Sequence, residues 1–527
     1  MTRVPVNSVG QPAQAGPDEA AGSLNGAGPD DPGDVTGPAL ATITRPRPRG
    51  PLDRPGPRGP IERVMSTLIR KLSGSRLTDP RVALSVSGVG LLLSMIAGAT
   101  APNVQTMRIK LPLSALFPSV SNIVVAGGLV YVGNVLACLG LAGMLWAHAK
   151  GWRPDPKRLL LVSAGIVAVM VSLTPVGSSD TASYAMYGRI SMQGGNPYTV
   201  SPLAWSAAHH DHAYLVLLGE AWTRTRSVYG PLATLVQSFA AWIGGSSVAT
   251  TIWVLMILNG AVFIAVGYLL LKTSDDPVRA TLFWTANPVL IQQLVSGGHL
   301  DTFVAAAAIC AIQVARRVSG MSGDVLIGLL IGLACAVKIN AVLIGIGLAW
   351  PLLRRREWAR TARIGAVSLV TIVLAYSPYG LAAFKPISKA SSLASWPSPW
   401  RGVQELAATI AGQPARAGHP AYDAATTVMG LLWPVAMIVV AWLIYQRISS
   451  DQPREIVAPF ALTFAWVLVA PWALPWYTAI AWATLTQVPR NRMTRWLTLV
   501  TVTLALWRSG GGHGAADLPA ITHNVFG

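Results

Sequence analysis

The chain has 527 residues, of which 52% are hydrophobic and only 12% are charged, and its formal net charge is +18. This composition is too apolar for a water-soluble protein of this length and excludes that class. The basic charge does not indicate a nucleic-acid partner, because 11 of the 40 Lys and Arg residues lie in residues 1–81 and 18 more lie in connections between apolar segments.

The first segment, residues 1–62, is rich in Pro, Gly and Arg and poor in apolar residues. A segment of this composition cannot bury a core, so we predict a disordered tail. It lacks the pattern of a charged stretch followed by an apolar one that marks a signal peptide. We therefore expect a retained cytoplasmic tail whose Arg residues attract anionic lipid headgroups.

Residues 63–507 form a predicted all-α, polytopic membrane domain, followed by a short extracytoplasmic tail at 508–527. Its apolar runs approach the roughly 20 residues that a membrane-spanning helix needs, and they lack the alternation of barrel strands. The three cysteines lie in apolar runs without metal-ligand spacing, which disfavours a disulfide framework. We predict about thirteen spans, at 81–102, 122–147, 158–176, 248–271, 279–297, 299–318, 324–338, 340–353, 363–382, 424–446, 456–470, 475–488 and 495–507.

The distribution of basic residues orients these spans. Cytoplasmic loops of membrane proteins are enriched in Lys and Arg, so the basic connections and the N-terminus are predicted to lie inside and the protein in the plasma membrane. This orientation requires that the 13-residue apolar stretch Pro231–Ile243 does not cross the membrane, and its length suits a re-entrant or interfacial helix. Two long loops, 177–229 and 383–423, then face outward and are where function is expected.

The loop 177–229 carries only three acidic residues, Asp180, Asp211 and Glu220. Asp180 stands where the loop leaves the third predicted span. An ionised carboxylate at this position is placed to act as a base on a lipid-borne substrate. The alternative is that Ser179 or Asp180 only caps a helix through about Gln193, which could lie along the membrane surface. The helix dipole would keep the carboxylate ionised in either case.

Two further clusters fall on the predicted outer face. Tyr229-Gly230-Pro231 leads into the short apolar stretch and is read either as a site element or as an ordinary turn. His299 and Asp301 lie in Gly297-Gly298-His299-Leu300-Asp301 at a helix junction. They could bind a sugar hydroxyl or shuttle a proton, or they could be a capped helix start with a solvated His.

Cations near the outer face are candidates for binding a phosphate. Lys338 lies in a largely apolar run, and an ionisable group there is a functional candidate, although it could also extend to the interface. The other candidates in or near the first long loop are Arg189, Arg224 and Arg226.

The run of His209, His210, Asp211 and His212 has no regular structure that would bring its side chains together. We therefore expect no metal or other cofactor, with a divalent cation at this run as the alternative. Trp476 and Tyr477 belong to an aromatic group near the outer interface. They can stack on sugar rings or anchor the chain at the membrane surface.

Taken together, these residues resemble the actinobacterial polyprenyl-phosphomannose-dependent α-1,6-mannosyltransferases. These are integral-membrane glycosyltransferases of the GT-C type that act in lipomannan core synthesis. The likeness spans about residues 80–507. The segments that carry it are Ser179-Asp180-Thr181-Ala182-Ser183-Tyr184, Gly188, Gly195-Asn196-Pro197-Tyr198, Ser201-Pro202, Tyr229-Gly230-Pro231-Leu232, Asn287-Pro288-Val289-Leu290, Gly297-Gly298-His299-Leu300-Asp301, Val337-Lys338 and Trp476-Tyr477.

The resemblance implies a role for each matched residue. Asp180 matches the acidic residue that serves as the base, and Lys338 the basic site near the donor phosphate. The residues implied for the sugar and acceptor site are Tyr184, Asn196, Tyr198, Tyr229, His299, Asp301, Trp476 and Tyr477. Many relatives have Asp in place of Asn196, Asn in place of Leu300 and an aromatic residue in place of Ala182. These departures leave the acceptor less well defined than the donor.

The expected function is inverting transfer of mannose from a polyprenyl-phosphate carrier to a lipid-anchored mannan acceptor, with an α-1,6 linkage. A related enzyme that uses another polyprenyl-linked sugar, for instance arabinofuranose, is the nearest alternative. A flippase or transporter of lipid-linked sugar is the alternative from another class. It would place its ionisable groups deeper in the bundle, where only Lys338 fits. The sequence indicates no oligomeric state.

Overall fold

The computed structural model describes residues 78–100, 109–120, 123–218, 220–391, 393–396, 398–448 and 454–507. The chain divides into two units, Met1–Ser66 and Thr67–Gly527, and the described residues all belong to the second. The tails expected at 1–62 and 508–527 lie outside the described residues.

The described residues form helices and connecting segments with no β-strand among them, which confirms the all-α prediction. Among the described residues, six helices are long and apolar enough to cross a membrane, and each coincides with a predicted span. Two of them expose most of their apolar side chains, as a lipid-facing helix would. The six are α2 (Pro80–Thr100), α3 (Ile123–Ala149), α10 (Val248–Thr273), α14 (Gly320–Val337), α16 (Trp358–Tyr376) and α19 (Pro420–Arg447).

Other predicted spans are shorter in the structure, so the count of thirteen is not confirmed. With 17 residues or fewer, these helices are marginal for crossing a bilayer on their own. They are α4 (Pro156–Met170), α13 (Asp301–Arg317), α15 (Val342–Arg354), α20 (Arg454–Val469), α21 (Thr478–Leu485) and α22 (Met493–Trp507).

The span predicted at 279–297 is not one continuous helix. It breaks into α11 (Pro277–Phe283), α12 (Pro288–Leu290) and a π-helix at Ile291–Ser296, labelled η4. The break lies at Asn287-Pro288, because proline lacks a backbone N–H and disfavours helical dihedral angles in the preceding residue. Asn287 is extended, and its side chain accepts hydrogen bonds from Val289 N and Leu290 N. The prediction failed because hydrophobicity does not report this interruption.

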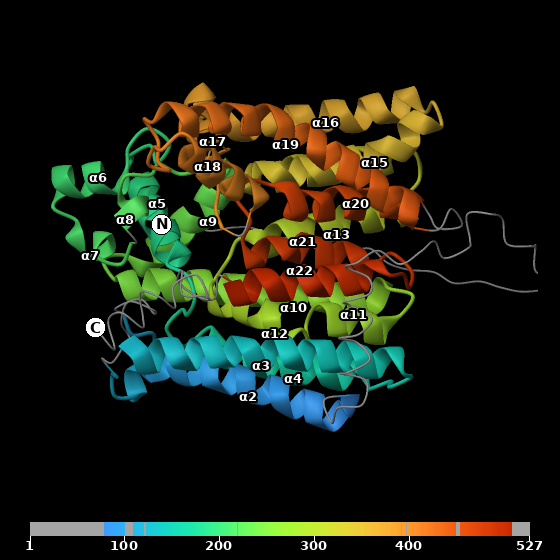
Figure 1. Cartoon of the computed structure of the whole chain (residues 1–527), viewed down its shortest axis with the longest axis horizontal. Helices are drawn as coiled ribbons and strands as arrows, with labels where there is room; N and C mark the ends of the chain where they lie inside the picture. Colours follow the sequence, from blue (N-terminus) through green and yellow to red (C-terminus); the bar gives the residue numbers. More distant parts are fainter. Residues whose placement is uncertain are drawn as a thin grey trace, which may run out of the picture. The chain divides into compact units, whose positions relative to one another are not determined.

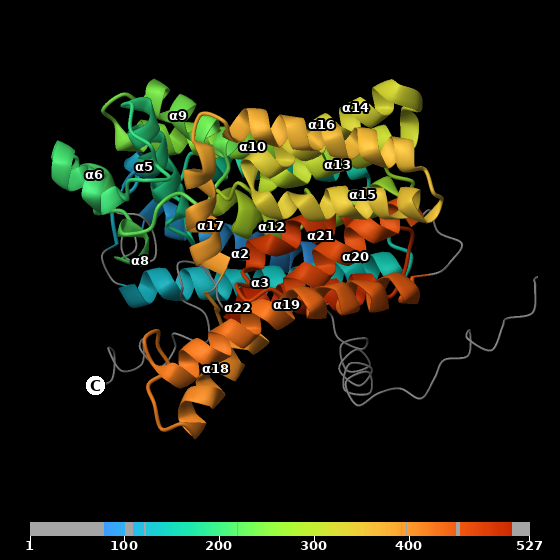
Figure 2. The ribbon, with the colours of Figure 1, turned by 90° about the horizontal axis from the view of Figure 1, so that it is seen from above.

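The helices of the two long loops gather toward the same end of the bundle (Figures 1 and 2). The bounds of those in the second loop are Lys385–Ser391 for α17 and Pro399–Ile410 for α18. In and after the first loop they are Asp180–Met192 for α5, Pro202–His209 for α6, His212–Leu215 for α7, Glu220–Thr223 for α8 and Pro231–Gly244 for α9.

Helix α5 forms where it was predicted, but it does not lie exposed along a surface. Its residues Thr181 to Gly188 are buried, as is Ile190. Gly188 brings α5 very close to α9, because a Cβ at this position would overlap the backbone of Gln237. The close packing holds α5 against α9.

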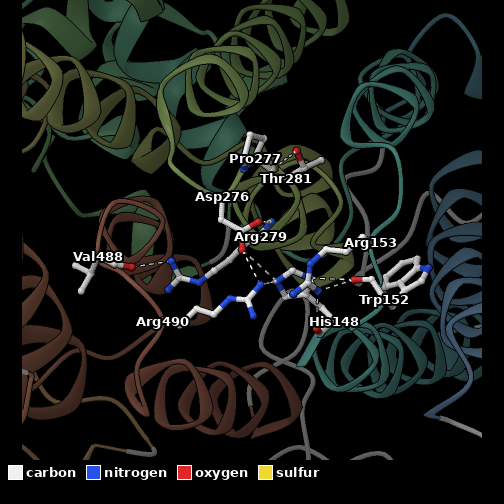
Figure 3. A network of polar contacts seen from close by, with 9 residues as sticks. All are labelled: His148, Trp152, Arg153, Asp276, Pro277, Arg279, Thr281, Val488 and Arg490. Atoms are coloured by element: carbon white, nitrogen blue, oxygen red, sulfur yellow. Dashed lines mark hydrogen bonds and ion pairs between the residues drawn. The ribbon is translucent and has the colours of Figure 1, made fainter. Parts of the chain in front are cut away.

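A polar network joins three chain segments near the C-terminal end of α3 (Figure 3). Asp276 accepts hydrogen bonds from Arg279 N at 3.0 Å and from Arg490 Nη2 at 2.8 Å. His148 Nε2 lies 3.6 Å from the same carboxylate, and Arg279 Nη1 donates to Val488 O at 2.6 Å. These hydrogen bonds and the ion pair connect the last turn of α3 to the α10–α11 and α21–α22 connections. This is the side of the bundle that the basic residues predict to be cytoplasmic.

Candidate active site

The carboxylate of Asp180 lies at the first turn of α5 and is only 16% exposed. Tyr184 Oη donates a hydrogen bond to Asp180 Oδ2 at 3.4 Å, and His299 Nδ1 lies 3.3 Å from the same oxygen. The helix cap is Ser179, which makes no capping bond through its side chain, so Asp180 is the first helical residue and not the cap. The carboxylate therefore meets side chains from its own helix and from a distant segment.

The glycines before His299 allow that segment to approach α5. Gly298 has a φ of +67°, which L-residues rarely adopt, and a Cβ there would overlap the methyl group of Thr181. At Gly297, a Cβ would lie 2.8 Å from His299 Nε2, so the imidazole folds back over this glycine. Sequence analysis identified the Gly-Gly-His motif but not its physical reason.

The ring of His299 stacks on Trp476, with centroids 3.7 Å apart and planes 14° from parallel. Trp476 belongs to the short helix η7 (Pro475–Tyr477). Both side chains are at least 90% buried. The stacking covers one face of the Trp476 ring and fixes the orientation of the imidazole toward Asp180.

Asp301 and Lys338 form a buried ion pair beside this histidine. Lys338 Nζ donates to Asp301 Oδ1 at 2.9 Å and to Oδ2 at 3.0 Å. The Asp301 side chain is 1% exposed and that of Lys338 is 14% exposed. The ammonium also lies 4.2 Å from the centroid of the Tyr477 ring, a cation–π distance. Lys338 ends α14 and is turned into the cluster, so it does not extend to the interface.

Tyr229-Gly230 connects the end of α14 to α5. Gly230 N donates to Val337 O at 2.9 Å, and a Cβ on Gly230 would overlap the carbonyl of Ala336. This approach brings the Tyr229 ring edge-on to Tyr184, with centroids 4.9 Å apart. The glycine is thus needed for contact with α14, beyond any role in a turn.

The charges of the cluster favour ionised Asp180. Burial opposes ionisation, but hydrogen bonding and charge from His299, together with the charge of Lys338, lower the pKa of Asp180 below its ordinary value of 3.8. Burial raises the pKa of Tyr184 well above 10, so its hydroxyl stays a donor. Asp180 is therefore a carboxylate at neutral pH with one oxygen held by two neighbours.

Some predicted site residues lie in other interactions. Arg189 Nε is 2.9 Å from Asp211 Oδ2 and its Nη1 donates to Gly245 O, so this guanidinium is already paired. Asn196 Oδ1 accepts from Tyr198 N at 2.9 Å. The buried Tyr198 shares a hydrogen bond of 2.9 Å with Thr234 Oγ1 and packs edge-on against Tyr379. The contacts of these three residues are with the surrounding loop and helices and not with Asp180.

Arg224 and Arg226 are exposed on the segment that leads to Tyr229, and neither makes a hydrogen bond or ion pair with another described residue. The segment is fastened to α5 by Tyr187 Oη, which donates to Thr225 O at 2.8 Å. Both guanidinium groups are therefore exposed with their donors available.

The histidine run of the first loop is dispersed. His209 stacks on Trp205 with centroids 3.7 Å apart, and Asp211 is engaged by Arg189. His210 adopts a left-handed conformation that ends α6. In the part of the chain that the structure describes, no group of three or more His, Cys, Asp or Glu side chains could hold a metal ion.

Sequence analysis missed a polar pocket against His299. The pocket is lined by Ser94, Val130, Asn134, Val176, Gly177, Gln292, Gln293, Ser296, Gly297 and His299. Its clearest signal in the sequence is the pair Gln292-Gln293 inside an apolar run. Hydrophobicity alone predicts a membrane span at this run and assigns no role to its amides.

The sequence was also compared with known proteins. Residues 83–354 match the family described as alpha-(1->6)-mannopyranosyltransferase, N-terminal domain. The chain belongs to this family. The matched range contains Asp180, Tyr229, His299 and Lys338, whereas Trp476 lies beyond it.

Two curated relatives carry the name alpha-(1->6)-mannopyranosyltransferase A. The protein from Mycobacterium tuberculosis is 25% identical over 367 residues, which cover 66% of this chain and 69% of the relative. The protein from Corynebacterium glutamicum is 23% identical over 447 residues, which cover 73% of this chain and 89% of the relative. No solved structure matches the chain. The resemblance to an actinobacterial α-1,6-mannosyltransferase family is thus confirmed.

Proposed function

We propose that the protein transfers mannose from a polyprenyl-phosphate carrier to a lipid-anchored mannan acceptor and forms an α-1,6 linkage. The observation that carries the proposal is the convergence of Asp180, His299 and the Asp301–Lys338 pair in one cluster. Membership of the mannopyranosyltransferase family supports mannose as the sugar. The reaction would take place at the outer side of the plasma membrane, within a GT-C-type bundle.

In the proposed reaction, Asp180 accepts the proton of an acceptor hydroxyl. The hydroxyl oxygen attacks C1 of a β-linked mannosyl phospholipid and forms the new C–O bond. The bond from C1 to the phosphate oxygen breaks on the opposite face, so an α-linkage results. The polyprenyl phosphate keeps the electron pair and leaves already ionised, so one base suffices and no acid is needed.

The leaving phosphate needs positive charge nearby. Lys338 is the cation of the buried cluster, but Asp301 neutralises much of its charge. The exposed Arg224 and Arg226 supply two further positive charges on the segment before Tyr229. We assign the phosphate to these three residues and not to Arg189, because Asp211 already pairs with that guanidinium.

The aromatic residues divide into two roles. Trp476 orients His299, since its ring is covered by the imidazole and is 9% exposed. Tyr184 and Tyr229 lie next to the base and would contact the sugars, and Tyr477 holds the ammonium of Lys338. We propose that catalysis needs no metal or organic cofactor.

The test is a transfer assay with membranes that contain the protein. Radiolabelled polyprenyl-phosphomannose and a short α-1,6-mannoside acceptor are incubated with excess chelator. We expect a longer mannoside whose label is released by an α-1,6-specific mannosidase. Three results would each contradict a part of the proposal: no transfer, transfer only from an arabinofuranosyl donor, or activity that a chelator abolishes and manganese restores.

A further inference from the structure

A small polar pocket lies beside His299, the neighbour of the proposed base. His299, which contacts Asp180, forms part of its wall, and so does Gly177, three residues before Asp180 in the sequence. Asn134 on α3 and the π-helix η4 supply its amide side chains. The cavity volume is about 20 Å³, which is room for about one water molecule or one hydroxyl group, and the pocket is partly open to solvent.

Two buried amides in the wall leave an oxygen without a partner. Gln292 Nε2 donates to Gly90 O at 3.2 Å and to Ser94 Oγ at 2.7 Å, and Asn134 Nδ2 donates to Ala505 O at 2.6 Å. These bonds to carbonyl oxygens identify which end of each amide is the nitrogen. The remaining atoms, Gln292 Oε1 and Asn134 Oδ1, accept no hydrogen bond in the part of the chain that the structure describes.

Hydrogen bonds to neighbouring helices explain the position of the two amide nitrogens, but they leave the two amide oxygens without a donor among the residues described. Gln292 is 7% exposed and Asn134 is 2% exposed, so an unpaired acceptor at either position is costly. Gln293, 7% exposed, makes no hydrogen bond to any described residue. Three amides without full partners in one pocket therefore call for a ligand that donates hydrogen bonds.

The charge of the wall indicates the chemical class of that ligand. The lining residues include no Lys, Arg, Asp or Glu. A phosphate would find no cation among them, and a cation would find no carboxylate. Hydroxyl groups suit the site, because each can donate to an amide oxygen and accept from an amide N–H. The π-helix that carries Gln292, Gln293 and Ser296 is a form often found at functional sites.

We propose that this pocket takes one hydroxyl group of a substrate hexose, which Gln292, Gln293 and Asn134 would bind. The proposal rests on the proposed sugar transfer at Asp180. Binding here would hold that hydroxyl group beside His299 and so set the position of the reacting hydroxyl or of C1 relative to Asp180.

The experiment replaces Gln293 by Met, which keeps the size of the side chain and removes its polar atoms. No hydrogen bond to a described residue is lost, so the thermal midpoint should stay near that of the unaltered protein. One lost hydrogen bond to a neutral hydroxyl should raise KM by about 3-fold to 10-fold. If the KM for the mannoside rises, the pocket holds the acceptor, and if the KM for polyprenyl-phosphomannose rises, it holds the donor.

Deoxy-mannoside acceptors test the acceptor arm directly. With the unaltered enzyme, the KM for one monodeoxy acceptor should be higher than that for the full mannoside by the same factor. With Gln293→Met, the KM values for these two acceptors should differ little, as in a double-mutant cycle. The matched control is Gln237→Met. Gln237 is a fully buried glutamine of α9 with unpartnered polar atoms, away from the pocket, and its variant should keep both KM values.

The two proposals fail in different ways. Absence of mannosyl transfer by the unaltered protein would contradict the proposed function. Normal transfer with unchanged KM values for both substrates in Gln293→Met would overturn the pocket proposal alone and leave water as its occupant. An equal rise of KM in Gln293→Met and Gln237→Met would also overturn it, since the effect would then not be local.

Discussion

At the scale of single residues, the site combines a carboxylate kept ionised with a buried ion pair beside it. Asp180 lies 3.3 Å from His299, and Asp301 lies 2.9 Å from the ammonium of Lys338. A base must remain ionised while it is shielded from water, and nearby positive charge makes this possible. Opposite charges within the cluster thus allow two carboxylates to be held close to each other.

The first prediction concerns the carboxylate itself. Asp180→Asn keeps the shape of the side chain and removes its ability to accept a proton, so the rate of transfer should fall by about 10²- to 10⁴-fold. Thermal stability and membrane insertion should be close to normal. The matched control is Asp155→Asn, because Asp155 caps α4 and Asn caps about as well. Near-normal turnover of the Asp180 variant at equal expression would exclude it as the base.

The pH dependence of transfer gives a second prediction. The pKa of Asp180 is lowered below 3.8, so the active carboxylate is fully populated at higher pH and is lost only as the pH falls through that lowered value. Its titration should therefore cause no loss of kcat between about pH 8 and pH 5. An acid limb near pH 6 that moves when Asp180 is replaced by Glu would contradict this.

The buried ion pair gives a third prediction. Asp301→Asn leaves the ammonium of Lys338 without its carboxylate, and Lys338→Met leaves the carboxylate of Asp301 without its ammonium. Each change should destabilise the fold by about 3–5 kcal/mol. The double variant should recover much of the thermal midpoint without recovering transfer. The control is Arg158→Met, which breaks the exposed Asp155–Arg158 pair, keeps the cap of α4 and should cost less than about 1 kcal/mol. Full activity of the double variant would remove Lys338 from the proposed phosphate site.

At the scale of helices, the site depends on close approaches between elements that are far apart in the sequence. α5 contacts α9 at Gly188, the η4–α13 connection at Gly298, and the end of α14 through the Tyr229-Gly230 connection. Each contact occurs where a glycine without a side chain lets its backbone approach a neighbouring segment closely. The site is thus assembled by packing of short segments against one another.

Gly298→Ala tests this assembly. The added Cβ meets Thr181, and the φ of +67° is unfavourable for Ala, so we expect a loss of more than about 1 kcal/mol in stability. The displaced His299 and Asp180 should reduce transfer by about 100-fold, because a shift of about 1 Å has that effect on reacting groups. Adding Thr181→Ser, which removes the methyl group, should restore part of the activity.

The control for this prediction is Gly430→Ala in α19, where an added Cβ would meet no heavy atom within 4 Å. Its transfer rate should match that of the unaltered protein. If Gly298→Ala behaves like Gly430→Ala, the close approach to α5 is not required for the site.

At the scale of the whole membrane domain, the remaining question is the orientation. Ala208 and Ala417 are exposed in the two long loops, and Lys150 is exposed in a basic connection. Replaced singly by Cys, the two alanines should react with an impermeant thiol reagent in intact cells, whereas Lys150→Cys should react only after lysis. The protein with its three native cysteines gives the background. The reverse pattern would place the site in the cytoplasm and contradict the proposed mechanism.

The sequence by itself determined the features that follow from composition and local pattern. Apolar runs identified the six long helices, Ser179 and Asp180 marked the start of α5, and Gly230-Pro231 marked the start of α9. The motifs also identified the family and the residues Asp180, His299, Asp301 and Lys338. These signals are readable because each depends on residues that are neighbours along the chain.

Only the tertiary structure decided which of the candidates meet. Arg189 and Lys338 are both cations of the predicted outer face, yet one pairs with Asp211 and the other with Asp301. The break at Asn287-Pro288 and the π-helix after it turned an apparent membrane span into the wall of a polar pocket. Hydrophobicity does not predict contacts between segments that are far apart in the sequence. These contacts form where a glycine lets one segment approach another closely, and the second segment cannot be identified from the residues next to that glycine.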